Sequence, residues 1–279
     1  MERQYKDKLP QWYMDDKTQY DLILSDDLDS FASCMVLKQV KDWDIEYFYR
    51  FDGMGKTKSA TNETVGVDIA LCKGKTFDNH VTKLHSDDPI NSESINLNCM
   101  ADISRINYFD KFCGSTLLTI WSLFDLPLPE SEEGKMILLC VDSTYLGFYS
   151  GYRQFKQANK HYLCDVLGLD ELYEVQQRHK QYDYQKVKKK YNLDAKIKGN
   201  KGIISTDIDI NTVSQEIGIP LILPDEKFYW HKVFSNNKIP IKNNQNNTVK
   251  IRDITDNPFS VALTGRDFLN YSVETERTK

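Results

Sequence analysis

Short apolar runs alternate with helix-patterned segments through the first half of this chain, and this alternation limits its fold more than any other feature. The run "DLILS" (21–25) suits a buried strand, and residues 28–42 carry apolar side chains at helical spacing. Strands that alternate with helices usually form a parallel sheet covered by helices. The sequence therefore predicts an α/β fold, with further strands at 45–51, 63–71 and 135–143 and a further buried helix at 114–125.

A charged, glycine-poor segment (165–192) rich in helix formers follows this alternating half, and a loop-like break (193–202) comes after it. Beyond the break, 219–235 and 257–274 read as strands on either side of the Asn-rich run "NNQNN" (243–247), which we expect to be a surface turn. These changes predict a main domain over residues 1–165, a long linker helix over 166–199 and a smaller α+β domain over 200–279.

The composition excludes some classes of protein. The chain has 279 residues, of which 36 are basic and 41 acidic, so its formal net charge is -5. That balance argues against a protein that coats duplex DNA through bulk charge, although it permits a local basic groove. No segment is long and apolar enough to span a membrane, and the polar start "MERQYKDKLPQWYMDDK" lacks a signal-peptide core. The six cysteines form no C-x-x-C pair and no zinc spacing, so we expect a cytoplasmic protein with reduced thiols and no membrane partner.

Aspartates gather at the expected carboxyl ends of three strands. Asp27 and Asp29 follow the first strand, Asp68 lies late in another, and Asp142 ends a third. Ligands of open parallel sheets bind at this end of the strands. One aspartate there is commonly a helix N-cap, a role that Asp26 or Asp27 can fill. Four converging carboxylates are instead hard oxygen ligands for one or two Mn²⁺ or Mg²⁺ ions, whose charge would offset the repulsion between the acids.

The segment "GKTFDNHVTKLHSDD" (74–88) adds polar side chains between Asp68 and Asp142. Asp78, Asn79 and His80 follow a short apolar turn, and His85 lies just downstream. A histidine beside a carboxylate, on a loop expected to face the same cleft, is a candidate metal ligand or phosphate contact.

The order of these motifs resembles the DHH phosphoesterase superfamily over about residues 20 to 150. That superfamily includes RecJ-like exonucleases, oligoribonucleases, cyclic-dinucleotide phosphodiesterases, exopolyphosphatases and family II pyrophosphatases. Its members carry His-x-Asp-x-Asp-Gly after a strand, an aspartate late in a second strand, an Asp-His-His motif, and an aspartate at the end of a further strand. In this chain the motifs match, in that order, Asp27 and Asp29 in "LSDDLDSFAS", Asp68 in "VGVDIAL", Asp78-Asn79-His80 in "FDNHVT", and Asp142 in "LLCVDSTYLGF".

The resemblance implies specific roles for these residues. It implies a metal site of one or two Mn²⁺ or Mg²⁺ ions, catalytic roles for Asp78 and His80, and substrate contacts from His80 and His85. The metal ligands implied are Asp27, Asp29, Asp68, Asp142 and Asn79.

Two positions depart from the family pattern. Ser25 stands where the family has its first histidine, and Asn79 replaces the middle histidine of the Asp-His-His motif. Both changes remove an imidazole, so the remaining site is richer in oxygen, which would favour a shift toward Mg²⁺, a single remaining metal or a loss of catalysis. Asp26 and His80 are each one residue from a vacated place and are the candidate substitutes.

The resemblance also implies that the C-terminal domain is a lid that grips the substrate phosphate. Gly265 and Arg266 in "NPFSVALTGRDFLNYS" are the best candidates for that contact, because an arginine fork matches phosphate geometry. The expected partner is a nucleotide or a short single-stranded nucleic acid, and a homodimer is allowed.

Three functions follow from these observations. The first is a metal-dependent phosphoesterase that uses a metal-activated water on a phosphodiester or phosphoanhydride of a nucleotide-type substrate. The second is a catalytically impaired DHH-like scaffold that binds a nucleotide, a nucleic acid or a protein. The third is a plain doubly wound domain in which the acids are helix caps and turn residues, without metal.

Overall fold

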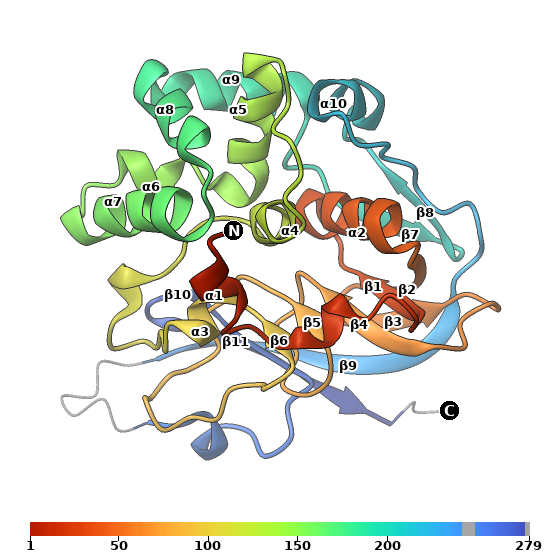
Figure 1. The fold of residues 1–279 in the computed structure, drawn as a ribbon. Coiled ribbons are helices and arrows are strands. Elements are labelled where there is room, and N and C mark those ends of the chain that lie inside the picture. The colour runs from red at the N-terminus through yellow and green to blue at the C-terminus, as the bar shows by residue number, and fades with distance from the viewer. Residues whose placement is uncertain (242–248, 277–279) are drawn as a thin grey trace.

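Nine strands form one curled, mixed sheet (Figure 1). The computed structural model describes residues 1–241 and 249–276, so the Asn-rich run 243–247 lies outside the described residues. The order across the sheet is β10-β11-β9-β3-β2-β1-β4-β5-β6, and β7 and β8 form a separate two-stranded sheet. The strands are β1 (Tyr20–Leu24), β2 (Asp44–Tyr49), β3 (Gly53–Lys56), β4 (Glu63–Val67), β5 (Thr76–Phe77), β6 (Ser94–Ile95), β7 (Ile197–Asn200), β8 (Ile203–Thr206), β9 (Tyr229–Pro240), β10 (Ser260–Gly265) and β11 (Phe268–Thr275).

The α/β class is confirmed, but the sheet is mixed and not wholly parallel. β1 pairs in parallel with β2 and β4, and β4, β5 and β6 continue the parallel half. β3, β9, β11 and β10 extend the sheet with antiparallel pairings. The carboxyl ends of β1, β4 and β5 therefore lie along one edge, as the strand-end hypothesis requires.

Helices cover one side of the parallel strands in the view of Figure 1. Leu22 and Leu24 of β1 pack in the main core with the apolar face of α2, whereas Ile23 packs in a second cluster on the other face. Such alternation follows from strand geometry, and burial on both faces explains the apolar run of residues 22–24 in β1. The helices are α1 (Arg3–Lys6), α2 (Leu28–Lys41), α3 (Leu97–Met100), α4 (Thr116–Leu123), α5 (Glu132–Cys140), α6 (Leu146–Tyr149), α7 (Arg153–Lys160), α8 (Asp170–Arg178), α9 (Gln181–Tyr191) and α10 (Ile210–Ile217).

The strand expected at 135–143 is wrong, because this segment forms α5. Ser131 caps its N-terminus by accepting a hydrogen bond from the backbone nitrogen of Gly134, and Glu132 and Glu133 lie in its first turn. α5 is buried among α8, α9 and α10. A helix buried on most sides is apolar almost throughout, so its sequence cannot be told from a buried strand by periodicity.

The long linker helix expected over 166–199 is also wrong. The chain there forms two helices, α8 and α9, which are interrupted by extended backbone at His179 and Lys180. α9 ends at Tyr191, its C-cap Asn192 has a left-handed backbone, and β7 begins at Ile197.

The C-terminal strands are part of the main sheet. β9 pairs with β3, and isolated bridges join Ser260 to Leu71 and Leu263 to Val81. These bridges bring β10 against the segments that follow β4 and β5. The sheet is therefore curled, so that the C-terminal strands lie near the carboxyl ends of β4 and β5. The domain boundaries and the movement of a lid stay predictions.

Among the described residues, no helix combines the length and the apolar character that crossing a membrane requires.

Candidate metal and phosphate site

The first acidic turn begins α2. Asp27 is the N-cap of this helix, where its carboxylate accepts a hydrogen bond from the backbone nitrogen of Ser30 at 3.2 Å. The Nζ of Lys196 lies 2.9 Å from a carboxylate oxygen of Asp26 and 3.4 Å from one of Asp27. Burial acts to lower the pKa of Lys196, but the charges of Asp27 and Asp26 raise it overall. Part of the counter-charge for this turn is therefore a lysine.

Asp29 anchors the start of α4. Its two carboxylate oxygens accept hydrogen bonds from the backbone nitrogens of Thr116 and Leu117, each at 2.8 Å. A negative charge at a helix N-terminus satisfies unpaired N–H groups and favours the helix dipole. Even so, burial raises the pKa of Asp29 well above its usual value, and the charges of Asp68, Asp142 and Asp27 raise it further.

Asp68 directly follows β4 and adopts a left-handed backbone with φ of 57°. Its carboxylate accepts a hydrogen bond from Oγ1 of Thr116 at 2.8 Å, which holds it toward the start of α4. Burial raises the pKa of Asp68 well above its usual value, followed by the charge of Asp27, while His80 opposes the shift. A buried, crowded carboxylate in this backbone conformation is typical of a functional site.

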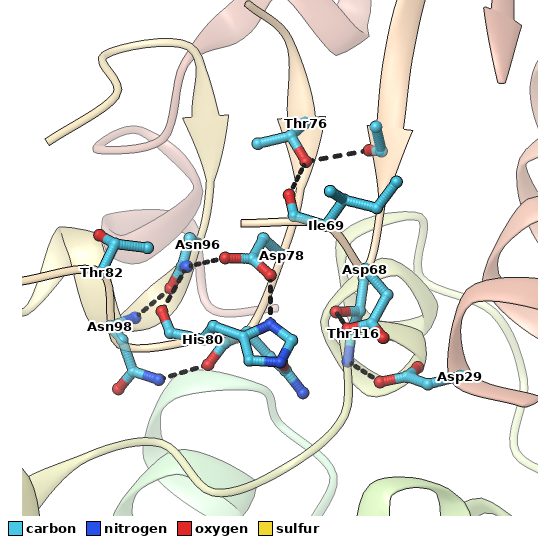
Figure 2. A network of polar contacts seen from close by, with 12 residues as sticks. Asp29, Asp68, Ile69, Thr76, Asp78, His80, Thr82, Asn96, Asn98 and Thr116 are labelled. Atoms are coloured by element: carbon cyan, nitrogen blue, oxygen red, sulfur yellow. Dashed lines mark hydrogen bonds and ion pairs between the residues drawn. The ribbon is translucent and has the colours of Figure 1, made fainter. Parts of the chain in front are cut away.

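Asp78 and His80 form a fixed pair after β5. The Nδ1 of His80 lies 2.7 Å from one carboxylate oxygen of Asp78, and Nδ2 of Asn96 donates to the other at 2.8 Å. Asn96 also donates to the carbonyl oxygen of His80 (Figure 2). Burial acts to lower the pKa of His80, but Asp78 and then Asp68 and Asp142 raise it to about 10. Since Nδ1 is engaged by Asp78, Nε2 is the ring nitrogen left for a metal or a phosphate.

Asn79 joins the fourth aspartate to the site. Its Nδ2 donates to the carbonyl oxygen of Gly114 at 2.8 Å and to a carboxylate oxygen of Asp142 at 2.9 Å. Asp142 follows α5 with a left-handed backbone, φ 49°, and is exposed. The sequence predicts Asp142 at the end of a strand, whereas in the structure it follows a helix.

Asp68, Asp78 and His80 are close enough to share one metal ion. One ligand atom from each of the three lies within 4.8 Å of the other two. Two carboxylates and an imidazole are a donor set that suits Mn²⁺ and its neighbours, and a carboxylate that orients a ligating histidine is a common feature of metal sites. The residues present therefore fit a divalent cation.

A small cavity of about 100 Å³ opens beside these residues. Ser25, Asp27, Asp68 and His80 line one side of it. The other side comes from the C-terminal strands and includes Asn236, Thr264, Asn270 and Tyr271. The Oδ1 of Asn270 is buried and has no hydrogen-bond partner among the described residues. An orphaned acceptor on a cavity wall indicates that a ligand or water belongs there.

Three expected substrate contacts do not line this cavity. His85 accepts a hydrogen bond from the backbone nitrogen of Asp87 at 3.1 Å and lies in its own loop. Gly265 ends β10, and the guanidinium of Arg266 lies 5.3 Å from the ring centroid of Phe109.

Sequence reasoning missed Asn96, Thr116, Lys196 and Asn270. Asn96 and Thr116 stand at the starts of α3 and α4, where a polar residue usually reads as a cap, and Asn96 does cap α3. Lys196 and Asn270 reach the site from distant parts of the chain, so no local signal could have identified them.

We compared the chain with protein-family models, curated proteins and solved structures, and none of them matches it. Its function must therefore be inferred from the chemistry of the site itself.

Proposed function

We propose that this protein is a divalent-metal-dependent phosphoesterase, which hydrolyses a phosphodiester or phosphoanhydride bond of a nucleotide-type substrate. The observation that carries the proposal is the convergence of Asp68, Asp78 and His80 beside a cavity. The DHH-like order of the motifs supports the same reaction class.

Each residue has a role in this proposal. Asp68, Asp78 and Nε2 of His80 would hold the cation, and Asp78 also fixes the orientation of the imidazole through its 2.7 Å contact with Nδ1. A bound Mn²⁺ or Mg²⁺ would lower the pKa of a water molecule and neutralise a phosphate oxygen. His80 must give up a proton to bind the ion, because a metal ligand is the neutral imidazole. Asn270 and Asn236 offer polar contacts to the substrate from the opposite wall.

The test is hydrolysis of an aryl phosphodiester and of short oligonucleotides with Mn²⁺ or Mg²⁺. Asp68→Asn and His80→Asn should each reduce turnover by about a hundredfold or more. Asp29→Ala is a poorer variant, because it also removes the anchor of α4. Asp21→Asn is the matched control, since Asp21 is a buried aspartate at the opposite end of β1. Turnover that needs no metal, or that persists in both site variants, would refute the proposal.

A second candidate function is metal-dependent binding without catalysis. It is favoured by Asn79, whose amide nitrogen faces Asp142, and by Asp29, whose two oxygens both accept backbone hydrogen bonds. This function predicts thermal stabilisation by Mn²⁺ or Mg²⁺ with no turnover of any phosphoester.

A further inference from the structure

A larger hollow lies apart from the acidic cavity, between the β7–β8 hairpin and the strands β2, β3 and β9. Its volume is about 580 Å³, which is in the range of small-molecule and nucleotide sites. Its walls combine aromatic rings, cations and the backbone of several glycines. We call it the aromatic groove and define it by Arg50, Lys201, Lys227, Phe228, Tyr229 and Trp230.

The aromatic groove is positively charged in a chain that is acidic overall. Arg50, Lys201 and Lys227 line it, and no acidic side chain does so among the described residues. Asp52 offsets Arg50 only weakly, at 3.8 Å and with most of its side chain exposed. Such a surface favours a ligand with negative charge.

Trp230 presents an exposed ring in the groove, and the guanidinium of Arg50 lies 5.6 Å from the ring centroid. Trp230 is 55% exposed, although large apolar side chains are normally buried. A Cβ atom placed on Gly53 would lie 2.1 Å from the indole, so the ring packs directly against the backbone there. Next to it, Tyr229 is 42% exposed and lies within 5.4 Å of the ammonium groups of Lys58 and Lys227. Neighbouring residues of a strand point to opposite faces of the sheet, and Tyr229 pairs with Lys56 whereas Trp230 pairs with Gly55, so Trp230 is the ring that faces the groove. An exposed ring bordered by cations is suited to stacking on a base whose phosphates the cations contact.

The aromatic groove adjoins the acidic site through the chain itself. Arg50 lines the groove and the next residue, Phe51, lines the acidic cavity. In addition, the carbonyl oxygen of Asp26 accepts a hydrogen bond from the backbone nitrogen of Ile197, the first residue of β7, at 2.8 Å. An extended ligand held in the groove would therefore lie next to the carboxylates.

We propose that the aromatic groove binds single-stranded nucleic acid. Trp230 stacks on a base, and Arg50, Lys201 and Lys227 contact the phosphates. Duplex is excluded because its bases are already stacked on one another and cannot cover the exposed indole. The statement that this strand is the substrate rests on the proposed function, whereas binding itself requires no catalysis.

Binding is measured by fluorescence anisotropy of a labelled short oligodeoxythymidylate, with EDTA present so that no metal-dependent hydrolysis occurs. Trp230→Ala should weaken binding by about tenfold to a hundredfold, because stacking on one base is lost. The double variant Lys201→Ala/Lys227→Ala should reduce the salt dependence, whose wild-type slope should be about -2 for three cations on a single strand. Tyr182→Ala is the matched control, because Tyr182 is 63% exposed and lies 4.5 Å from the ammonium of Lys186, on α9 and outside the groove.

Tryptophan fluorescence gives an independent readout. Trp43 and Trp121 are 1% exposed and Trp12 is half-buried, so Trp230 is the one exposed tryptophan. The oligonucleotide should quench its emission, and Trp230→Phe should lose the quenching but keep most of the affinity.

The inference is overturned if the oligonucleotide does not bind, if duplex binds as tightly, or if Tyr182→Ala weakens binding as much as Trp230→Ala. These results are separate from those on catalysis. Binding without hydrolysis of any phosphoester would overturn the proposed function and support the groove. Hydrolysis of an aryl phosphodiester without oligonucleotide binding would support the proposed function and overturn the groove.

Discussion

Replacing Asp68 by asparagine tests the metal site most directly. Asparagine has the same shape, tolerates the left-handed backbone at this position, and can still accept the hydrogen bond from Thr116. Only a negative charge is removed, from a carboxylate that burial and neighbouring acids already disfavour. In EDTA we therefore expect Asp68→Asn to be at least as stable as the wild type.

The cation should reverse this order. A ligand at about one hundred times its Kd stabilises the folded state by about 2.7 kcal/mol. At about 2–4 °C per kcal/mol for a chain of this size, the wild type should gain about 5–10 °C in Tm on addition of Mn²⁺ or Mg²⁺. Asp68→Asn should lose most of this gain, because one of three close ligands no longer carries a charge.

Differential scanning calorimetry with EDTA and with each metal measures both effects. The control is Asp21→Asn, since this buried carboxylate accepts hydrogen bonds from the backbone nitrogens of Thr61 and Asn62 and lies at the opposite end of β1. It should lower Tm equally with and without metal. A wild type that gains no stability from either ion, or a gain that survives in Asp68→Asn, would contradict the metal site.

Three further changes, one of them with a control variant, test the fold. Glu132 has a pKa lowered to about 2, chiefly by its hydrogen bond with Arg178. A carboxylate with a lowered pKa stabilises the fold above its ordinary pKa of 4.5, and this stabilisation is lost as the pH falls toward 2. Glu132→Gln should therefore cost about 1 kcal/mol near neutral pH and progressively less between pH 4.5 and pH 2, as measured by urea unfolding. Glu174→Gln, whose carboxylate is 3.7 Å from the same arginine, should change little. Asn98→Ala should cost about 3 kcal/mol by denaturant unfolding, because it removes three buried hydrogen bonds to backbone groups. Gly134→Ala should cost about 2 kcal/mol, because the added Cβ would lie 2.2 Å from the backbone oxygen of Glu216 in α10. An unchanged Tm would refute that packing.

The sequence identifies elements whose pattern is local. The apolar run of β1, the acidic cap at Asp27 and the helical spacing of α2 each depend on residues close together in the chain, and all three are present in the structure. The segment 257–274 was likewise expected to be extended, and it contains β10 and β11, although their pairing as a hairpin was not predicted.

The segment 135–143 shows where local pattern is insufficient. An apolar run reports burial, and burial is common to a central strand and to a helix packed on most sides. Its assignment to α5 depends on α8, α9 and α10, which surround it.

The candidate site combines both kinds of information. The sequence alone determines which acids exist and that several of them follow strands. Only the tertiary structure decides that Asp78 holds His80, that Lys196 pairs with Asp26 from 170 residues away, and that the curled sheet sets Asn270 opposite the carboxylates. These contacts depend on strand pairing over long separations, which is chosen by the packing of the whole chain and leaves no periodic signal in any one segment.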